Sequence, residues 1–223
     1  VQSGGVGEHR FGAFMAGITG RVRTLNISPW RKDAEDRYGL EWLPIRPNTD
    51  AALIMALTQQ IIAAGQADRA FLDRYTQGAD RYFDYLAGRS DGVVKSPEWA
   101  AAITGIPADQ IRALAAELPG KRVMVALNWS LQRSRHGEQP YWAAIALAAA
   151  LGQIGLPGGG FAFGYGSSNA MGNPDYRTPL QGLSVGRNQT GLSMPVARIA
   201  DMLLNPGTTY RYDGAERTYP EVK

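Results

Sequence analysis

One stretch, residues 123–163, constrains what this chain can fold into more than any other. It begins with a β-rich apolar run at residues 123–127, continues through a polar segment, and becomes an alanine-rich helix that ends at Pro157 and a cluster of glycines. The order of strand, polar loop, helix and stiff turn is typical of α/β proteins. Ligands bind to such proteins at the carboxyl ends of the strands, where helix amino-termini present unpaired N–H groups.

The residues before this stretch extend the same pattern. A glycine-dense opening is followed by two short strands with turn signals, which predicts a mostly parallel sheet flanked by helices. Asn48, Thr49 and Asp50 predict a capped start for the next helix, which Gly65 ends. The strands are predicted at residues 22–27 and 42–45, and the helices at residues 50–64, 68–75, 79–86, 97–103 and 107–118.

The residues after this stretch change in character. Glycine, serine, asparagine and proline predict a long polar loop from residue 164 to about residue 194. A short helix at residues 196–204 follows, and the dipeptide Asp213-Gly214 predicts a hairpin turn.

The composition excludes several classes of function. The 23 basic residues are interleaved with 20 acidic ones, so we expect no nucleic-acid partner. The chain has no cysteine and therefore no disulfide, zinc–thiolate cluster, iron–sulfur ligand or thiol nucleophile. Its longest apolar stretch, residues 143–151, is shorter than the roughly 18 residues of a membrane span, so we expect none. Val1 is not an initiator methionine, and we expect the chain to be a piece of a longer protein.

Asp50, in the first turn of its predicted helix, has two interpretations. Its carboxylate can interact favourably with the helix dipole, as first-turn acids commonly do. It can also accept hydrogen bonds from a ribose diol or a guanine edge. The residues alone leave both open.

The polar cluster after the strand at residues 123–127 is the stronger candidate for a binding site. Four side chains that form hydrogen bonds follow a strand that we expect to be buried: Asn128, Trp129, Gln132 and Arg133. A solvated loop is the alternative. If these residues bind a ligand, it should be flat and rich in hydrogen-bonding edges, with Arg133 contacting anionic oxygens.

The glycine runs and the histidines carry weaker signals. Gly4 and Gly5 can let backbone N–H groups approach a phosphate or can form an ordinary tight turn, because no complete phosphate-binding motif surrounds them. His9 and His136 lack metal-ligand spacing, and no Ser-His-Asp order or carboxylate pair stands out. We therefore assign no catalytic residue and no metal ligand, and we expect any chemistry to come from a cofactor.

The segment LNWSLQRSRHGEQPYWAAIALAAALGQIGLPGGGFAFGYGSSN resembles the signature region of the dimethyl-sulfoxide-reductase family of molybdopterin enzymes. Within that family it is most similar to the branch of biotin sulfoxide and trimethylamine-N-oxide reductases. Three more segments extend the resemblance over nearly the whole chain: LPIRPNTDAALIMAL, SPEWAAAITGIPADQIRALA and PVARIADMLLNPGTTYRYDG. The less distinctive GGVGEHRF resembles the family's first nucleotide-side loop.

The resemblance implies a bis(molybdopterin guanine dinucleotide) enzyme with a Rossmann-like α/β fold inside a larger multidomain protein. Residues 1–165 would form the cofactor-binding domain. Residues 166–223 would form the polar loop, a short helix and the start of the next sheet segment of the same catalytic unit.

The resemblance also implies roles for particular residues by matching position. Asp50 would bind the guanosine end of one dinucleotide, in a loop shaped by Pro47 and Thr49. Ser28 stands where many relatives have an aspartate, so a charged ribose contact is lost, although its hydroxyl can form one hydrogen bond. The pterin and diphosphate would be lined by Asn128, Trp129, Gln132 and Arg133, with phosphate near Gly4 and Gly5.

The implied reaction is oxygen removal from S-oxides or N-oxides of the biotin sulfoxide, dimethyl sulfoxide or trimethylamine N-oxide type, with electrons from a donor protein or a small reductant. We expect the molybdenum ligand, a serine in this branch, to lie outside this chain, and the chain alone to be inactive. Bacterial cytoplasm and periplasm both stay open. Two alternatives remain: a formate- or nitrate-type molybdopterin oxidoreductase, against which the LQRSRHGEQ run argues, and a non-catalytic nucleotide-binding or scaffold module.

Overall fold

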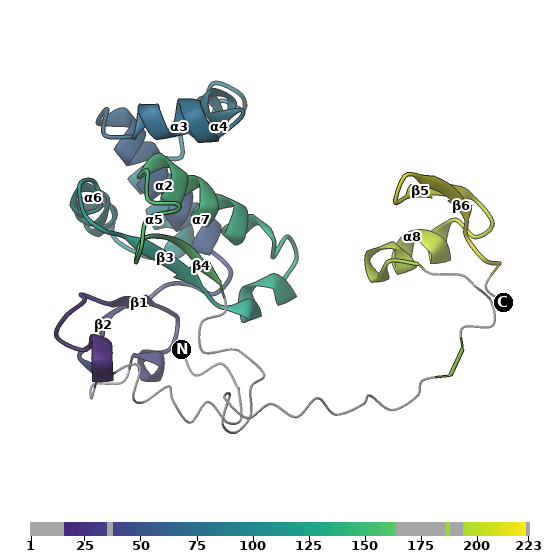
Figure 1. Ribbon diagram of the computed structural model, residues 1–223, viewed down its shortest axis with the longest axis horizontal. Helices are drawn as coiled ribbons and strands as arrows, with labels where there is room; N and C mark the ends of the chain where they lie inside the picture. Colours follow the sequence, from purple (N-terminus) through teal and green to yellow (C-terminus); the bar gives the residue numbers. More distant parts are fainter. Residues whose placement is uncertain (1–15, 35–37, 164–185, 188–193, 222–223) are drawn as a thin grey trace. The chain divides into compact units, whose positions relative to one another are not determined.

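Figure 1 shows the computed structural model of the chain, which describes residues 16–34, 38–163, 186–187 and 194–221. The chain divides into two compact units, Val1–Arg177 and Thr178–Lys223. The boundary predicted between residues 165 and 166 lies outside the described residues and stays a prediction, and Gly4 and Gly5 also lie outside them.

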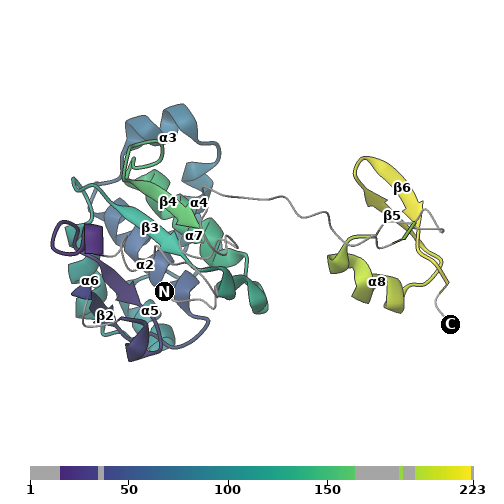
Figure 2. The same ribbon diagram turned by 60° about the horizontal axis from the view of Figure 1, so that its bottom comes forward.

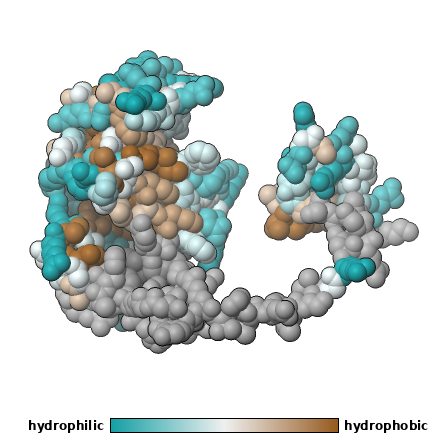
Figure 3. All heavy atoms as spheres, in the orientation of Figure 1, coloured by the Kyte–Doolittle hydropathy of each residue, from teal (hydrophilic) through white to brown (hydrophobic). Residues whose placement is uncertain are grey.

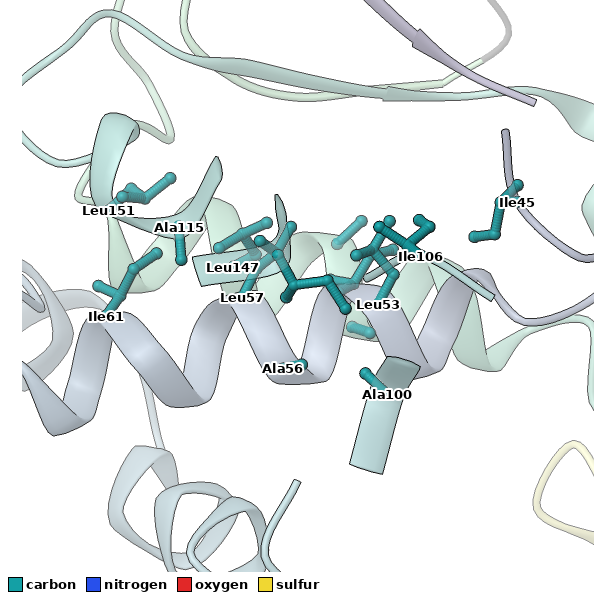
Figure 4. Packing of buried hydrophobic residues seen from close by; sticks show 14 residues of the cluster. Ile45, Leu53, Ala56, Leu57, Ile61, Ala100, Ile106, Ala115, Leu147 and Leu151 are labelled. Atoms are coloured by element: carbon teal, nitrogen blue, oxygen red, sulfur yellow. The ribbon is translucent and has the colours of Figure 1, made fainter. Parts of the chain in front are cut away.

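Four helices form the core of the first unit, and the longest of them packs against the other three. Leu53, Leu57 and Ile61 recur at a spacing of four along this helix and are buried. Figure 4 shows them with Leu147 from a neighbouring helix in one apolar cluster. The four helices are α2 (Asp50–Ala63), α5 (Pro97–Thr104), α6 (Ala108–Glu117) and α7 (Gln139–Ala150).

Local sequence signals set the helix ends in this unit. The Ser96 hydroxyl accepts a hydrogen bond from the Trp99 N–H (3.2 Å), which caps α5, and Gly105 ends that helix with φ of 78°. The cap predicted for α2 is wrong. The Thr49 hydroxyl instead donates to the carbonyl oxygen of Arg46 at 2.6 Å, and no side chain caps the first turn of α2.

Two shorter helices, α3 (Arg69–Tyr75) and α4 (Ala79–Leu86), lie next to this core and bury Leu72 and Phe83. After α4 the chain turns around a buried lysine. Lys95 is 2% exposed, and its ammonium group donates to Asp91 (2.7 Å) and to the carbonyl oxygen of Val93 (2.6 Å).

The strands of the first unit form two parallel pairs. β1 (Leu25–Ile27) pairs with β2 (Glu41–Leu43), and β3 (Met124–Leu127) pairs with β4 (Gly160–Phe163). Between β1 and β2 lies a short 3-10 helix, η1 (Arg31–Asp33). The structure therefore has an α/β architecture with small sheets, and a single mostly parallel sheet stays a prediction.

Two expectations about the β3–β4 pair are corrected. Residues 160–163 form a strand, although the sequence predicted only a stiff turn there. β3 is half-buried, because α2 and α7 cover one face of the pair, as Figures 1 and 2 show, while Met124 on the other face is 43% exposed.

The second unit is a small α/β hairpin module. A short 3-10 helix, η4 (Val196–Arg198), leads into α8 (Ile199–Leu204), and β5 (Thr209–Tyr212) pairs with β6 (Ala215–Thr218). The hairpin predicted from Asp213 and Gly214 is confirmed, and both residues have positive φ angles, of 52° and 74°. Apolar side chains lie exposed over η4 and α8 (Figure 3): Val196, Ile199, Leu203 and Leu204. No helix among the described residues of either unit is long and apolar enough to cross a membrane.

Candidate functional site

The carboxyl ends of β3 and β4 form one edge, and three aromatic rings gather there. Leu127 and Phe163 are paired at the ends of the two strands, so the residues after Leu127 start beside Phe163. The Trp129 indole stacks on Phe163, with ring centroids 5.5 Å apart and planes inclined by 17°. Tyr141 meets Phe163 edge-on, at 5.2 Å and 87°. Because Trp129 remains 41% exposed, this edge offers an aromatic surface to a flat ligand.

The 3-10 helix η3 (Trp129–Arg133) carries the predicted polar residues along this edge. Asn128 precedes it, and its carbonyl oxygen accepts a hydrogen bond from the Tyr141 hydroxyl (2.6 Å). Gln132 and Arg133 are exposed, and Arg133 forms no ion pair within the part of the chain that the structure describes. A polar, partly cationic loop at the end of parallel strands can bind an anionic group.

The side chain of Asn128 is the most specific feature of the edge. Its Oδ1 atom is buried and has no hydrogen-bond partner among the described residues. A buried acceptor without a donor costs about 1–3 kcal/mol, so such an atom is rarely left unpaired without a reason. A ligand that donates an N–H group would remove this cost. The side-chain nitrogen of Asn26, in the middle of β1, is likewise buried and without a partner in the described chain.

Asp50 lies close to the same loop. Burial raises the pKa of its carboxyl group, and a hydrogen bond from its own backbone N–H opposes that rise. Burial also raises the pKa of the Tyr141 hydroxyl, a backbone hydrogen bond with Gln132 lowers it, and the charge of Asp50 adds to the rise. The charge of Asp50 at the start of α2 thus acts on the tyrosine that contacts the loop of η3.

The remaining predicted residues are placed differently. Pro47 is exposed, and it precedes Asn48, which has a φ of 62° at the turn into α2. Ser28 lies at the carboxyl end of β1, where its hydroxyl donates to the carbonyl oxygen of Trp30 (2.9 Å) and accepts from the Trp30 N–H (3.3 Å). The Ser28 hydroxyl is therefore already used in a local turn.

Sequence reasoning missed three residues of this edge: Gly137, Tyr141 and Phe163. A side chain at Gly137 would place its Cβ atom 2.6 Å from the carbonyl oxygens of Leu131 and Gln132, so the loop requires glycine there. Tyr141 could have been found from its place in the first turn of the helix after the polar cluster. Phe163 could have been found from the apolar run after the glycines.

A cavity of about 420 Å³ lies at the opposite end of β3 and contains none of the predicted residues. Arg122 and Gln153 line it, and the Gln153 side chain accepts a hydrogen bond from the Val123 N–H (3.1 Å). We place the candidate site at the carboxyl edge because the aromatic surface and the unpartnered Asn128 oxygen lie there.

The first unit is an α/β unit with an aromatic and polar edge, and comparison with known proteins gives the family. The family model for molybdopterin oxidoreductase matches residues 16–208, so the chain belongs to the molybdopterin oxidoreductase family. Among solved structures, the acetylene hydratase from Pelobacter acetylenicus has a TM-score of 0.55 and 23% identity, over 66% of this chain and 19% of that chain. That similarity concerns the fold alone.

Curated relatives are more similar in sequence. A biotin sulfoxide reductase from Cereibacter sphaeroides is 47% identical over 100% of this chain and 30% of its own length. A dimethyl sulfoxide/trimethylamine N-oxide reductase from the same organism is 43% identical over 91% of this chain and 26% of its own length. A trimethylamine-N-oxide reductase from Haemophilus influenzae is 39% identical over 90% of this chain and 26% of its own length. The chain thus spans less than a third of the length of these relatives.

Proposed function

We propose that this chain is the cofactor-binding portion of a molybdenum-dependent reductase that removes oxygen from S-oxides or N-oxides. The names of its relatives support this reaction class. The observation that carries the proposal is the buried amide oxygen of Asn128, which has no hydrogen-bond partner among the residues that the structure describes, next to the exposed indole of Trp129. Together these groups suit a flat heterocycle that donates N–H groups, as a pterin does.

The residues of the edge fit a pterin that carries a nucleotide diphosphate. The pterin would lie against Trp129 and donate a hydrogen bond to the Oδ1 atom of Asn128. Arg133 would bind the anionic diphosphate oxygens, because a guanidinium group forms paired, charge-assisted hydrogen bonds with such oxygens. The Gln132 amide would supply a further donor and acceptor.

The guanosine end of one molybdopterin guanine dinucleotide would lie at the start of α2. Asp50 would accept hydrogen bonds there, which offset the cost of burying its carboxylate. Pro47 and Thr49 would shape the loop, and Gly4 and Gly5 would lie near phosphate. We expect little from Ser28, because Trp30 already engages its hydroxyl.

We propose that the whole protein binds two such dinucleotides and that both parallel strand pairs belong to one Rossmann-like, mostly parallel sheet. Apolar residues of both pairs support this, since Ile27 and Leu43 pack against the same core as Val125, Leu127 and Phe161.

When bound, the molybdenum cofactor would supply the chemistry, which is the two-electron, two-proton reduction of the oxide to a sulfide or amine and water. The residues of this chain would bind and orient it. The metal ligand and the electron donor, a protein or a small reductant, would come from outside residues 1–223. We therefore expect no turnover from this chain alone.

The full-length protein tests the proposal. We expect molybdenum and guanine nucleotide in the purified protein, and oxidation of a reduced viologen dye that depends on an added sulfoxide or N-oxide. Arg133→Ala should lower the molybdenum content, whereas Arg74→Ala on α3 should leave it unchanged. Absence of molybdenum would refute the proposed reaction. So would reduction of an oxidised dye by formate, or oxidation of the reduced dye by nitrate, in a protein that oxidises the reduced dye with neither oxide.

A further inference from the structure

The side chain of Tyr141 connects α7 to the loop of η3. Tyr141 lies in the first turn of α7, and its hydroxyl donates to the carbonyl oxygen of Asn128 at 2.6 Å, just before η3 begins. The Gln132 backbone, near the end of η3, also acts on this hydroxyl and lowers its pKa. The phenol group therefore links α7 to the residue at which the loop of the candidate binding residues begins.

The ring of Tyr141 also acts on the indole of Trp129. Its edge packs on Phe163, and Phe163 stacks on Trp129. Phe163 thus contacts both rings, and the indole of Trp129 remains 41% exposed. At Gly137 the loop is closely packed, because a Cβ atom there would lie 2.6 Å from the carbonyl oxygens of Leu131 and Gln132.

We propose that Tyr141 is a positioning residue that sets the orientation of Asn128, Trp129 and Gln132 toward the bound cofactor. The inference rests on the proposed function, because it takes the loop to be a cofactor contact. Tyr141 itself is not assigned a contact with the cofactor or the substrate. Its partly buried hydroxyl stays protonated at neutral pH and so keeps its hydrogen-bond donor.

The positioning role of Tyr141 depends on where its hydrogen bond lies and less on how much stability that bond adds. A hydrogen bond contributes little net stability, but loss of the Tyr141 O–H leaves the Asn128 carbonyl oxygen without this donor. The loop would then sample other positions. A displacement of about 1 Å in groups that hold a reacting centre is enough to lower the rate strongly.

The test uses the full-length protein loaded with its cofactor. Tyr141→Phe removes the hydroxyl and keeps the ring on Phe163, and Tyr141→Ala removes both. Tyr75→Phe, at an exposed position on α3, is the matched control. Molybdenum per protein is measured by mass spectrometry, together with the visible absorption spectrum of the oxidised metal centre and kcat and KM for a sulfoxide.

We expect Tyr141→Phe to lower molybdenum occupancy under limiting molybdate roughly two- to tenfold, the range that loss of one hydrogen bond produces. The visible spectrum of the molybdenum that remains should shift, and kcat per molybdenum should fall more than KM changes. Tyr141→Ala should show larger effects in the same direction, and Tyr75→Phe none.

Two results would overturn the inference. Tyr141→Phe could match the wild type in occupancy, spectrum and kcat, while Arg133→Ala loses molybdenum. Alternatively, Tyr141→Phe could lower the thermal midpoint and the occupancy with an unchanged spectrum and kcat per molybdenum, which would show a structural role alone. If Arg133→Ala also keeps its molybdenum, the proposed function fails instead.

Discussion

Gly137→Ala tests whether the loop of η3 is as tightly packed as its geometry indicates. The added Cβ atom would lie 2.6 Å from the carbonyl carbon and oxygen of Gln132 and from the carbonyl oxygen of Leu131. These atoms belong to the backbone, so no side-chain rotation relieves the contact. Inserting a methyl group into a packed site costs about 1–3 kcal/mol, and three backbone contacts place this case near 3 kcal/mol.

Gly17 provides the matched control for this substitution. It lies in a short helical segment and needs no left-handed backbone, and a Cβ atom added there would meet no neighbouring atom of the described residues within 4 Å. Gly17→Ala should therefore leave stability unchanged or raise it by roughly 0.5–1 kcal/mol, the helix preference of alanine over glycine.

Thermal unfolding and molybdenum content of the full-length protein are the measurements. A loss of about 3 kcal/mol corresponds to roughly 6–12 °C for a cooperative unit of about 150–250 residues. Gly137→Ala should therefore lower the midpoint by several degrees and reduce the molybdenum content, and Gly17→Ala should do neither. A Gly137→Ala protein with the wild-type midpoint and wild-type molybdenum content would refute the reasoning.

Three further predictions address charge and packing. Burial raises the pKa of Asp50, so its contribution to the stability of the cofactor-free protein is lost as pH rises through the raised pKa. Asp50→Asn should raise cofactor-free stability at neutral pH yet weaken cofactor retention, and unchanged retention would favour the helix-dipole interpretation. Hydrogen bonds from the Lys95 side chain and the Val93 N–H lower the pKa of Asp91. The stability that Asp91 contributes is therefore present above the ordinary pKa of an aspartate and is lost as pH falls through the lowered pKa. Asp91→Asn should thus lower the unfolding midpoint at pH 7 and flatten its decline toward acid, and parallel pH profiles for variant and wild type would contradict this. Leu147→Ala, in the core between α2 and α7, should lower the free energy of unfolding in denaturant by about 2–5 kcal/mol. A decrease below about 1 kcal/mol would show that the neighbouring side chains can fill the space left by the leucine.

Much of the helical structure could be predicted from local signals. The spacing of Leu53, Leu57 and Ile61 predicted the buried face of α2, and the Asp213-Gly214 turn predicted the hairpin of the second unit. These features depend on residues close together in the chain. The helix cap at Thr49 was wrong because a competing carbonyl oxygen, that of Arg46, lies within reach of the same hydroxyl.

Local signals did not predict the β4 strand. Residues 160–163 are short and follow glycines, so nothing local separates a strand from a turn. Pairing with β3 decides the matter, because the partner strand supplies the backbone hydrogen bonds that a strand needs.

The sequence by itself determined the family and the polar cluster after β3, because residue identity and spacing carry that information directly. A binding role for Asp50 stays a prediction. The tertiary structure decided that Tyr141 and Phe163 belong to the same edge and that the Ser28 hydroxyl forms its hydrogen bonds in a local turn. It also decided that the side-chain oxygen of Asn128 is buried with no partner in the described part of the chain. The physical reason is that hydrogen-bond partners and ring contacts join residues far apart in the chain, and their pairing exists only once the strands and helices have packed.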